Sequence, residues 1–118
     1  MIIAIPVDEG KEAVCASFGR TPYFLIHCTE NGQTDVFVNP AAKAQGGAGI
    51  QSAQFVVDAG ADTLITVRCG QNAADVFKAA NIKIYKATGG SVDDQLKAFA
   101  EGKLVELTSF HAGFHGKV

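Results

Sequence analysis

The spacing of hydrophobic positions changes near residue 40 and divides the chain into two kinds of local structure. Before this point, apolar or alternating runs over 2–7, 23–30 and 33–39 are typical of β-strands. The pair Asn31-Gly32 separates the last two runs, and this dipeptide favours a two-residue turn. The first third of the chain therefore predicts three strands, of which the second and third form a tight antiparallel hairpin.

After residue 40, helical and strand patterns alternate. The elements expected there are a helix from about 48 to Gly60, a strand over 62–67, a helix over 72–80 capped by Asn72, a strand over 82–87, and a helix that begins after Ser91 and ends at Gly102. The order β-β-β-α-β-α-β-α predicts an α/β domain with a five-stranded mixed sheet, an antiparallel second strand and about three helices. We expect one domain over 1–105 and a C-terminal tail over 106–118.

The composition is typical of a small folded domain and disfavours several classes of protein. The chain has 118 residues, 47% of them hydrophobic, and a net charge of -2, so it offers no broad basic surface for nucleic acid or an anionic membrane. Residues 1–7 are the most apolar run, which is too short for a spanning helix and unlike a signal peptide. A cytoplasmic location is expected. The three cysteines form no C-x-x-C pair, which favours free thiols or metal ligands over a disulfide framework.

Parallel strands place their carboxyl ends at one rim of a sheet, and the loops expected at this rim hold the candidate chemistry. These loops are residues 8–22, 39–47, 68–71 and 87–91. They contain both arginines of the chain, Arg20 and Arg68, and two of its cysteines, Cys15 and Cys69. Residues that let backbone approach a ligand, or that lie at expected helix starts, are Gly46, Gly47, Gly49, Gly70 and Asn72.

Together these loops predict a receptor for a compact anion. Fixed guanidinium charges and helix N-termini both favour negative charge, and the same surroundings would push the thiols of Cys15 and Cys69 toward thiolate, the form that binds metal. The glycine-rich stretch 46–49 lacks the Lys-Ser/Thr of a P-loop, and no dinucleotide fingerprint is present. The plainer alternative stays open: the glycines serve as turns and caps, and the cysteines are small inert hydrophobes.

Two other groups of residues suggest different chemistry. The strand order also suits ribonuclease H-like nucleases, which gather carboxylates around two metal ions. Asp8 and Glu9 follow the first strand, whereas Asp62 precedes the fourth, so we expect these acids at opposite ends of the sheet. His111 and His115 have a helical metal-binding spacing, but nearby glycines break helices, so a tail with incidental metal affinity is expected.

Five segments, in this order and spacing, resemble the dinitrogenase iron–molybdenum cofactor-binding family. They are MIIAIPVD at 1–8, SFGRTPYF at 17–24, Asn39-Pro40, GGAGI at 46–50 and CGQNA at 69–73, and the similarity covers about residues 1–105. The resemblance implies a ribonuclease H-like fold. It also implies a non-enzymatic role in carrying or storing metal–sulfur clusters, such as nitrogenase cofactor precursors or the molybdenum–copper sulfide clusters of orange proteins. Cofactor carriers tend to have His before the Phe-Gly pair, where this chain has Ser17, so no ligand role transfers to Ser17.

The sequence thus predicts a non-catalytic protein that binds, stores or transfers a preformed anionic cluster containing molybdenum, iron or copper. Arg20 and Arg68 would supply counter-charge, N–H groups near 46–49 and 70–72 would donate to sulfide, and Cys15 or Cys69 would anchor the metal. Expected partners are the cluster and a cluster-assembly or acceptor protein, with neither nucleic acid nor membrane, and the chain is expected as a monomer or weak homodimer. One alternative is a module that binds a small organic anion or nucleotide; a metal-dependent nuclease is less favoured.

Overall fold

The computed structural model describes residues 1–110, and the predicted order of elements is confirmed in it. The elements are β1 (Ile2–Val7), β2 (Tyr23–Cys28), β3 (Thr34–Val38), α1 (Ala48–Asp58), β4 (Thr63–Thr66), α2 (Gln71–Ala79), β5 (Lys83–Lys86) and α3 (Val92–Ala100). Among the described residues, no helix combines the length and the apolar character that crossing a membrane requires.

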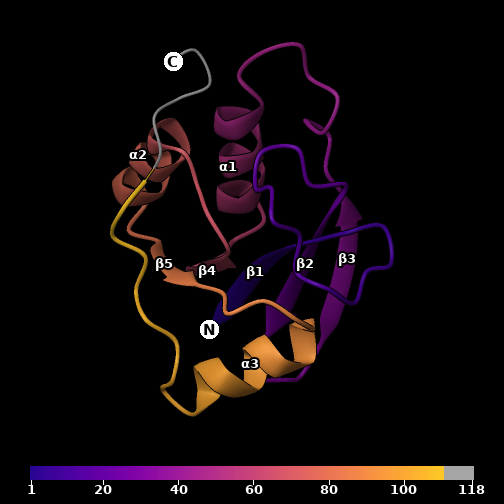
Figure 1. Cartoon of the computed structure of the whole chain (residues 1–118), viewed down its shortest axis with the longest axis vertical. Helices are drawn as coiled ribbons and strands as arrows, with labels where there is room; N and C mark the ends of the chain where they lie inside the picture. The colour runs from indigo at the N-terminus through magenta and orange to yellow at the C-terminus, as the bar shows by residue number, and fades with distance from the viewer. Residues whose placement is uncertain (111–118) are drawn as a thin grey trace.

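The five strands form one open mixed sheet in the order β3-β2-β1-β4-β5 (Figure 1). β2 is antiparallel to both β1 and β3, whereas β4 is parallel to both β1 and β5. The predicted ribonuclease H-like α/β fold, with an antiparallel second strand, is therefore confirmed. The antiparallel hairpin of β2 and β3 is present as well, but the predicted two-residue turn is wrong. The Cys28 N–H donates to the Gln33 carbonyl at 2.9 Å, so the four residues 29–32 form the loop, and among them only Gly32 has a left-handed φ, of 75°.

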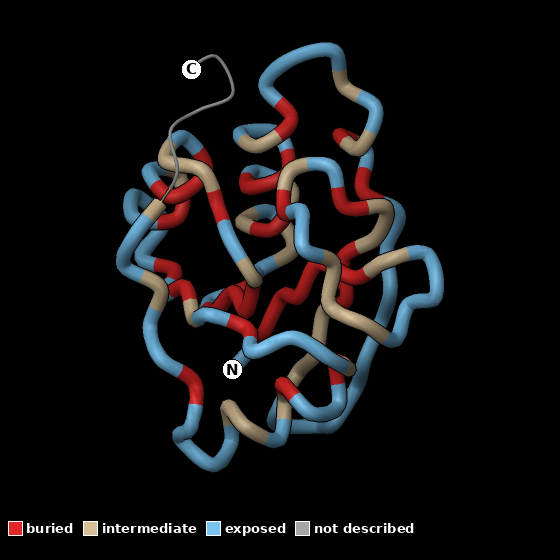
Figure 2. Tube along the Cα trace, in the orientation of Figure 1, coloured by how far each residue is buried: buried red, intermediate tan, exposed pale blue. Residues whose placement is uncertain are grey.

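The helices cover the two faces of the sheet in separate layers (Figure 1). α1 and α2 pack side by side on one face, and α3 packs on the other. Successive residues of β1 divide between the layers, because strand side chains alternate: Ala4 faces the α1/α2 layer, whereas Ile3 and Ile5 face the α3 layer. Figure 2 shows the central strands as the most deeply buried part of the chain.

Phe18 ties the long β1–β2 loop to the α1/α2 layer. Its ring centroid lies 5.4 Å from that of Phe24 on β2 and 5.5 Å from that of Phe77 on α2. Burying a side chain of this kind contributes about 1.5–3 kcal/mol. One aromatic residue thus anchors the long connection between β1 and β2 in the core.

The helix starts agree with the sequence at α3 and differ at α2. Ser91 caps α3 as predicted, because its Oγ accepts from the Asp94 N–H at 3.1 Å. At α2 the cap position is Gly70, with extended backbone and no side-chain cap, and Asn72 is exposed in the first turn. The predicted Asn72 cap is therefore wrong, because the helix begins before Asn72 and leaves its side chain outside.

The chain stays against the sheet after α3. The Lys86 N–H donates to the Val105 carbonyl, and the Leu107 N–H donates to the Ile84 carbonyl, both at 2.8 Å. This segment therefore runs beside β5, and Phe110 packs against the α1/α2 layer. The expected tail from residue 106 lies on the domain as far as Phe110.

Candidate functional site

Four connections leave the sheet at one edge, which we call the carboxyl rim. Val7 of β1 pairs with Tyr23, and Tyr23 pairs with Val38, so β1 and β3 end together. β4 and β5 run parallel to β1 and end at the same edge. The carboxyl rim comprises the connections 8–22, 39–47, 67–70 and 87–91, so the predicted loops are found there, the third of them one residue earlier than the predicted 68–71.

A buried network of hydrogen bonds joins two rim connections to α1. Asn39, only 3% exposed, donates through Nδ2 to the carbonyls of Gly19 at 3.2 Å and Thr21 at 3.0 Å. Ser52 of α1 donates through Oγ to the Gly19 carbonyl at 2.7 Å, and the Ala41 N–H donates to Asn39 Oδ1 at 3.0 Å. The network therefore holds the backbone on both sides of Arg20. Sequence reasoning singled out Asn39 only as part of a family motif and missed this role.

The start of α1 lies between the 8–22 connection and α2. A Cβ built on Gly19 would come 3.1 Å from both the N and the Cα of Gly49, which is closer than side chains normally approach backbone. On its other side, Gly49 faces α2, since a Cβ built there would lie 3.9 Å from that of Ala73. The 8–22 connection thus touches the first turn of α1, and the first turn of α1 lies close to that of α2.

Both arginines are exposed at the carboxyl rim. Arg20 Nη1 donates to the carbonyls of Ala44 at 2.7 Å and Ala42 at 3.3 Å, so it braces the connection before α1. Arg68 follows β4, and its carbonyl accepts from Thr66 Oγ1 at 3.2 Å. Neither guanidinium has a carboxylate within ion-pair distance in the described part of the chain. Within the described residues each arginine is thus a positive charge without an ion-pair partner, although the 8–22 connection also carries Asp8, Glu9 and Glu12.

The helix N-termini at the carboxyl rim fall into two kinds. α1 starts from Gly47, in a left-handed conformation with φ 69°, and α2 starts from Gly70; neither start has a side-chain cap or an acid in the first turn. α3, in contrast, has the Ser91 cap and both Asp93 and Asp94 in its first turn. The partial positive charge of a helix N-terminus is thus offset at α3 and left open at α1 and α2.

The other predicted site residues lie at these two open starts. Gly46 is exposed, and a Cβ built there would meet nothing within 4 Å. Asn72 is exposed on the first turn of α2, next to the Arg68–Gly70 turn. The hydrogen-bond network joins the backbone on both sides of Arg20 to Ser52 of α1. Arg68, Gly70 and Asn72 lie together at the start of α2.

The two rim cysteines have different surroundings. Cys69 is 1% exposed among hydrophobic side chains, and its burial raises the pKa of the thiol to about 12. The prediction that the surroundings of Cys69 push it toward thiolate is therefore wrong, because apolar burial outweighs the nearby charge and helix start. Cys15 is half-buried, and its N–H donates to the Pro6 carbonyl at 2.9 Å, beside the end of β1.

Within residues 1–110, no three His, Cys, Asp or Glu side chains come together in a way that could hold a metal ion. His111 and His115 lie outside the described residues, so their metal-binding spacing stays a prediction. The described part of the chain therefore has no site that could bind a metal ion through protein side chains alone. A cluster that brings its own sulfide ligands needs fewer ligands from the protein.

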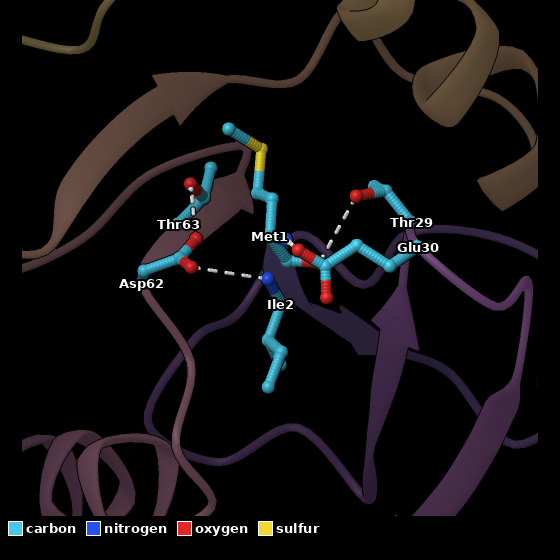
Figure 3. Close-up of polar contacts among 6 residues, drawn as sticks. All are labelled: Met1, Ile2, Thr29, Glu30, Asp62 and Thr63. Carbon is cyan, nitrogen blue, oxygen red and sulfur yellow. Dashed lines mark hydrogen bonds and ion pairs between the residues drawn. The ribbon is translucent and has the colours of Figure 1, made fainter.

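The acids that a ribonuclease H-like nuclease would gather are separated, as the sequence predicted. Asp62 lies at the amino end of β4, where its carboxylate accepts from the Ile2 N–H at 3.1 Å and from Thr63 Oγ1 at 3.0 Å (Figure 3). Asp8 lies at the opposite end of the sheet and accepts from the Gly10 N–H at 3.1 Å. Asp62 therefore helps to hold the first strand in place and does not join Asp8 in a two-metal site.

The fold and the carboxyl rim define a small α/β protein with two exposed arginines and two uncapped helix starts along one end of its sheet. The chain matches the family model described as dinitrogenase iron-molybdenum cofactor over residues 1–102, and it belongs to that family. The family is associated with cofactor binding. The predicted family is thereby confirmed.

Several known proteins are similar over most of the chain. An uncharacterized protein of Methanocaldococcus jannaschii is 36% identical over 107 residues, which cover 88% of this chain and 89% of the relative. A solved Thermotoga protein, provisionally described as a NifB protein, is 39% identical with a TM-score of 0.78, over 92% of this chain and 95% of that one. The apo orange protein of Desulfovibrio gigas is 26% identical with a TM-score of 0.85, over 92% and 93% of the two chains.

Proposed function

We propose that this protein binds a preformed anionic metal–sulfur cluster at the carboxyl rim, and stores it or passes it on without catalysing a reaction. The observation that carries the proposal is the pair of open helix starts of α1 and α2, which lie close together and are flanked by exposed Arg20 and Arg68. Membership of a cofactor-related family and similarity to the orange protein support the same class of ligand.

The backbone at the two helix starts would provide the hydrogen-bond donors. Within residues 1–110, the N–H groups of the first residues of α1, from Ala48 to Ile50, have no acceptor, and the same holds for Gln71 to Ala73 of α2. Free N–H groups at a helix start bind anions readily. The exposed pair Gly46-Gly47 leaves this backbone open to a ligand as bulky as a cluster.

Arg20 and Arg68 would supply counter-charge, and Cys15 would supply the covalent ligand. Cys15 is the better candidate of the two rim cysteines, because Cys69 must lose a tightly held proton before it can bind metal. Hydrogen bonds to charged groups contribute about 1.5–3 kcal/mol each. A site that depends on them holds a cluster less tightly than four thiolates would, and this suits reversible storage or transfer.

The cargo we propose contains molybdenum, iron or copper, and the partner is a protein that assembles or accepts the cluster. The chain would act as a monomer or weak homodimer in the cytoplasm, where thiols remain reduced.

A direct test exposes the apoprotein under anaerobic conditions to tetrathiomolybdate with copper, and separately to iron(II) with sulfide. Charge-transfer absorption that co-elutes with protein, followed by metal analysis, identifies the cargo.

The matched variants are Arg68→Ala and Lys83→Ala. Both remove an exposed cation, but Lys83 lies at the amino end of β5, away from the carboxyl rim. We expect wild type and Lys83→Ala to retain the cluster, and Arg68→Ala to retain about tenfold less, which corresponds to the loss of one charge-assisted contact. Equal retention by both variants, or no retention by wild type, would contradict the proposal.

A second candidate is a module that binds a small organic anion or nucleotide at the same helix starts. The raised pKa of Cys69 favours it, because such a ligand needs no thiolate. Cys15→Ser separates the two functions: this variant should lose the cluster yet keep a small anion. Isothermal titration with inorganic phosphate and with ATP, on wild type and Cys15→Ser, measures the second function directly.

A further inference from the structure

β3 forms one edge of the sheet, and its outer side has no partner strand among residues 1–110. All five of its residues are exposed, and three of them are apolar: Val36, Phe37 and Val38, the last 69% exposed (Figure 2). Exposed apolar edge strands tend to pair with other chains, and proteins usually protect them with charges or proline. β3 has no lysine and no proline, and Asp35 is its one charged residue, so most of its outer side remains open for pairing.

The register shows which backbone groups of β3 face outward. The Cys28 N–H donates to the Gln33 carbonyl, and the Asn39 N–H donates to the Pro22 carbonyl. Hydrogen-bonded positions alternate along an antiparallel pair, so odd-numbered residues of β3 bond to β2. The N–H and C=O groups of Thr34, Val36 and Val38 are therefore the ones free for another strand.

A groove runs beside this edge, between β3 and α1. It has a volume of about 380 Å³ and is lined by Ile26, Asp35, Phe37, Phe55, Asp58 and Ala59. Its floor is aromatic, since the rings of Phe37 and Phe55 lie 6.2 Å apart in an edge-to-face arrangement. The groove lies between the edge strand β3 and the C-terminal half of α1, which supplies Phe55 and Asp58.

The two aspartates give the groove its charge. Asp35 accepts from Gln33 Nε2, and Asp58 accepts from Gln54 Nε2, both at 2.9 Å. Neither has a cationic partner in the described part of the chain. An aromatic floor with two carboxylates above it suits a side chain with an apolar stem and a positive end, which describes lysine and arginine.

We propose that β3 and this groove bind an extended segment of a partner protein, which adds a strand to the sheet and places a lysine or arginine between Asp35 and Asp58. The free groups of Thr34, Val36 and Val38 would supply the backbone hydrogen bonds, and the groove would select the side chain. A second copy of this chain fits poorly, because its β3 would bring a second Asp35 and no lysine or arginine to pair with the aspartates of the groove. This inference is independent of the cluster site at the carboxyl rim.

The test titrates the ¹⁵N-labelled protein with a synthetic peptide of the sequence Val-Lys-Val-Thr-Val-Arg, and with a matched peptide that has glutamate at the basic positions. We expect the basic peptide to shift the amide signals of Thr34, Val36 and Val38 and to bind more tightly than the acidic one. Replacing both aspartates, as Asp35→Asn and Asp58→Asn, should weaken binding about fivefold. Val36→Pro removes one outward N–H and should weaken binding about tenfold.

Asp75→Asn is the control for charge. Asp75 lies on α2 and accepts from Gln71 Nε2 at 2.8 Å, the same four-residue arrangement as Gln54 and Asp58, but it lies outside the groove. Equal binding of the acidic peptide, or unchanged binding by the double asparagine variant, would overturn the proposal. Shifts of the β3 signals on dilution of the free protein would also overturn it, because they would identify a second copy as the occupant. Amide signals of β1 and β4 report whether each variant remains folded.

Discussion

Gly19 and Gly49 meet backbone to backbone at the carboxyl rim, where a Cβ on Gly19 would lie 3.1 Å from the N and Cα of Gly49. Gly19 belongs to the connection that carries Arg20, and Gly49 lies in the first turn of α1. The contact therefore sets how closely a positive side chain approaches an open helix start. Any side chain at Gly19 has to push the two segments apart.

Gly19→Ala should lower the free energy of unfolding by about 1–3 kcal/mol, the usual cost of inserting a methyl group into a filled space. It should also reduce cluster retention, because the methyl group displaces Arg20 from α1. Gly46→Ala is the control, since a Cβ there meets nothing and should leave stability unchanged. Urea unfolding compares the two variants, and equal stabilities would show that the close approach is not a constraint.

Asn39→Ala should lower the free energy of unfolding by about 1–3 kcal/mol, because the carbonyls of Gly19 and Thr21 lose a buried donor. Cluster retention should fall as well, because these two carbonyls flank Arg20. Asn31→Ala, in the hairpin at the far end of the sheet, removes an acceptor for the Gln33 N–H and should leave retention intact. Full retention by Asn39→Ala would show that the network does not position the site.

The stability of the protein should fall as the pH rises above about 9. The Cys69 thiol has an ordinary pKa of 9.0, which burial raises to about 12 in the folded chain. Between these values the unfolded chain releases a proton that the folded chain keeps, so the free energy of unfolding decreases by up to about 1.4 kcal/mol per pH unit. Cys69→Ala should remove this slope, and urea unfolding from pH 8 to 11 measures it. An unchanged slope in the variant would assign the effect to other groups.

Ser91→Ala should destabilise the fold by about 0.5–2 kcal/mol, because the Asp94 N–H loses its capping oxygen. Cluster retention should not change, since α3 starts with its own cap and acids and lies on the other face of the sheet from α1 and α2. Thermal unfolding measures the first effect, and metal analysis after gel filtration measures the second. Loss of the cluster in this variant would extend the binding site to α3.

The elements, the hairpin and the α3 cap were predictable because they depend on residues close together in the chain. The continuous apolar run of β1 and the glycine in the loop between β2 and β3 are signals that each act over a few residues. The position of the carboxyl rim was also predictable, because right-handed crossovers between parallel strands allow few topologies for this order of elements. Local pattern and chirality were thus enough to predict that Arg20 and Arg68 lie at the carboxyl rim.

Other features depend on which distant residues meet, and only the tertiary structure decided them. Cys69 is a rim residue by sequence, but its side chain points into the α1/α2 layer, where burial keeps it protonated. The hydrogen bonds of Asn39 and the uncovered edge at β3 likewise depend on the placement of loops and of α1. The periodicity of a sequence indicates which face of a helix or strand is apolar. It does not indicate where a loop side chain points or how much of the sheet a helix covers, because both depend on how all the layers pack together.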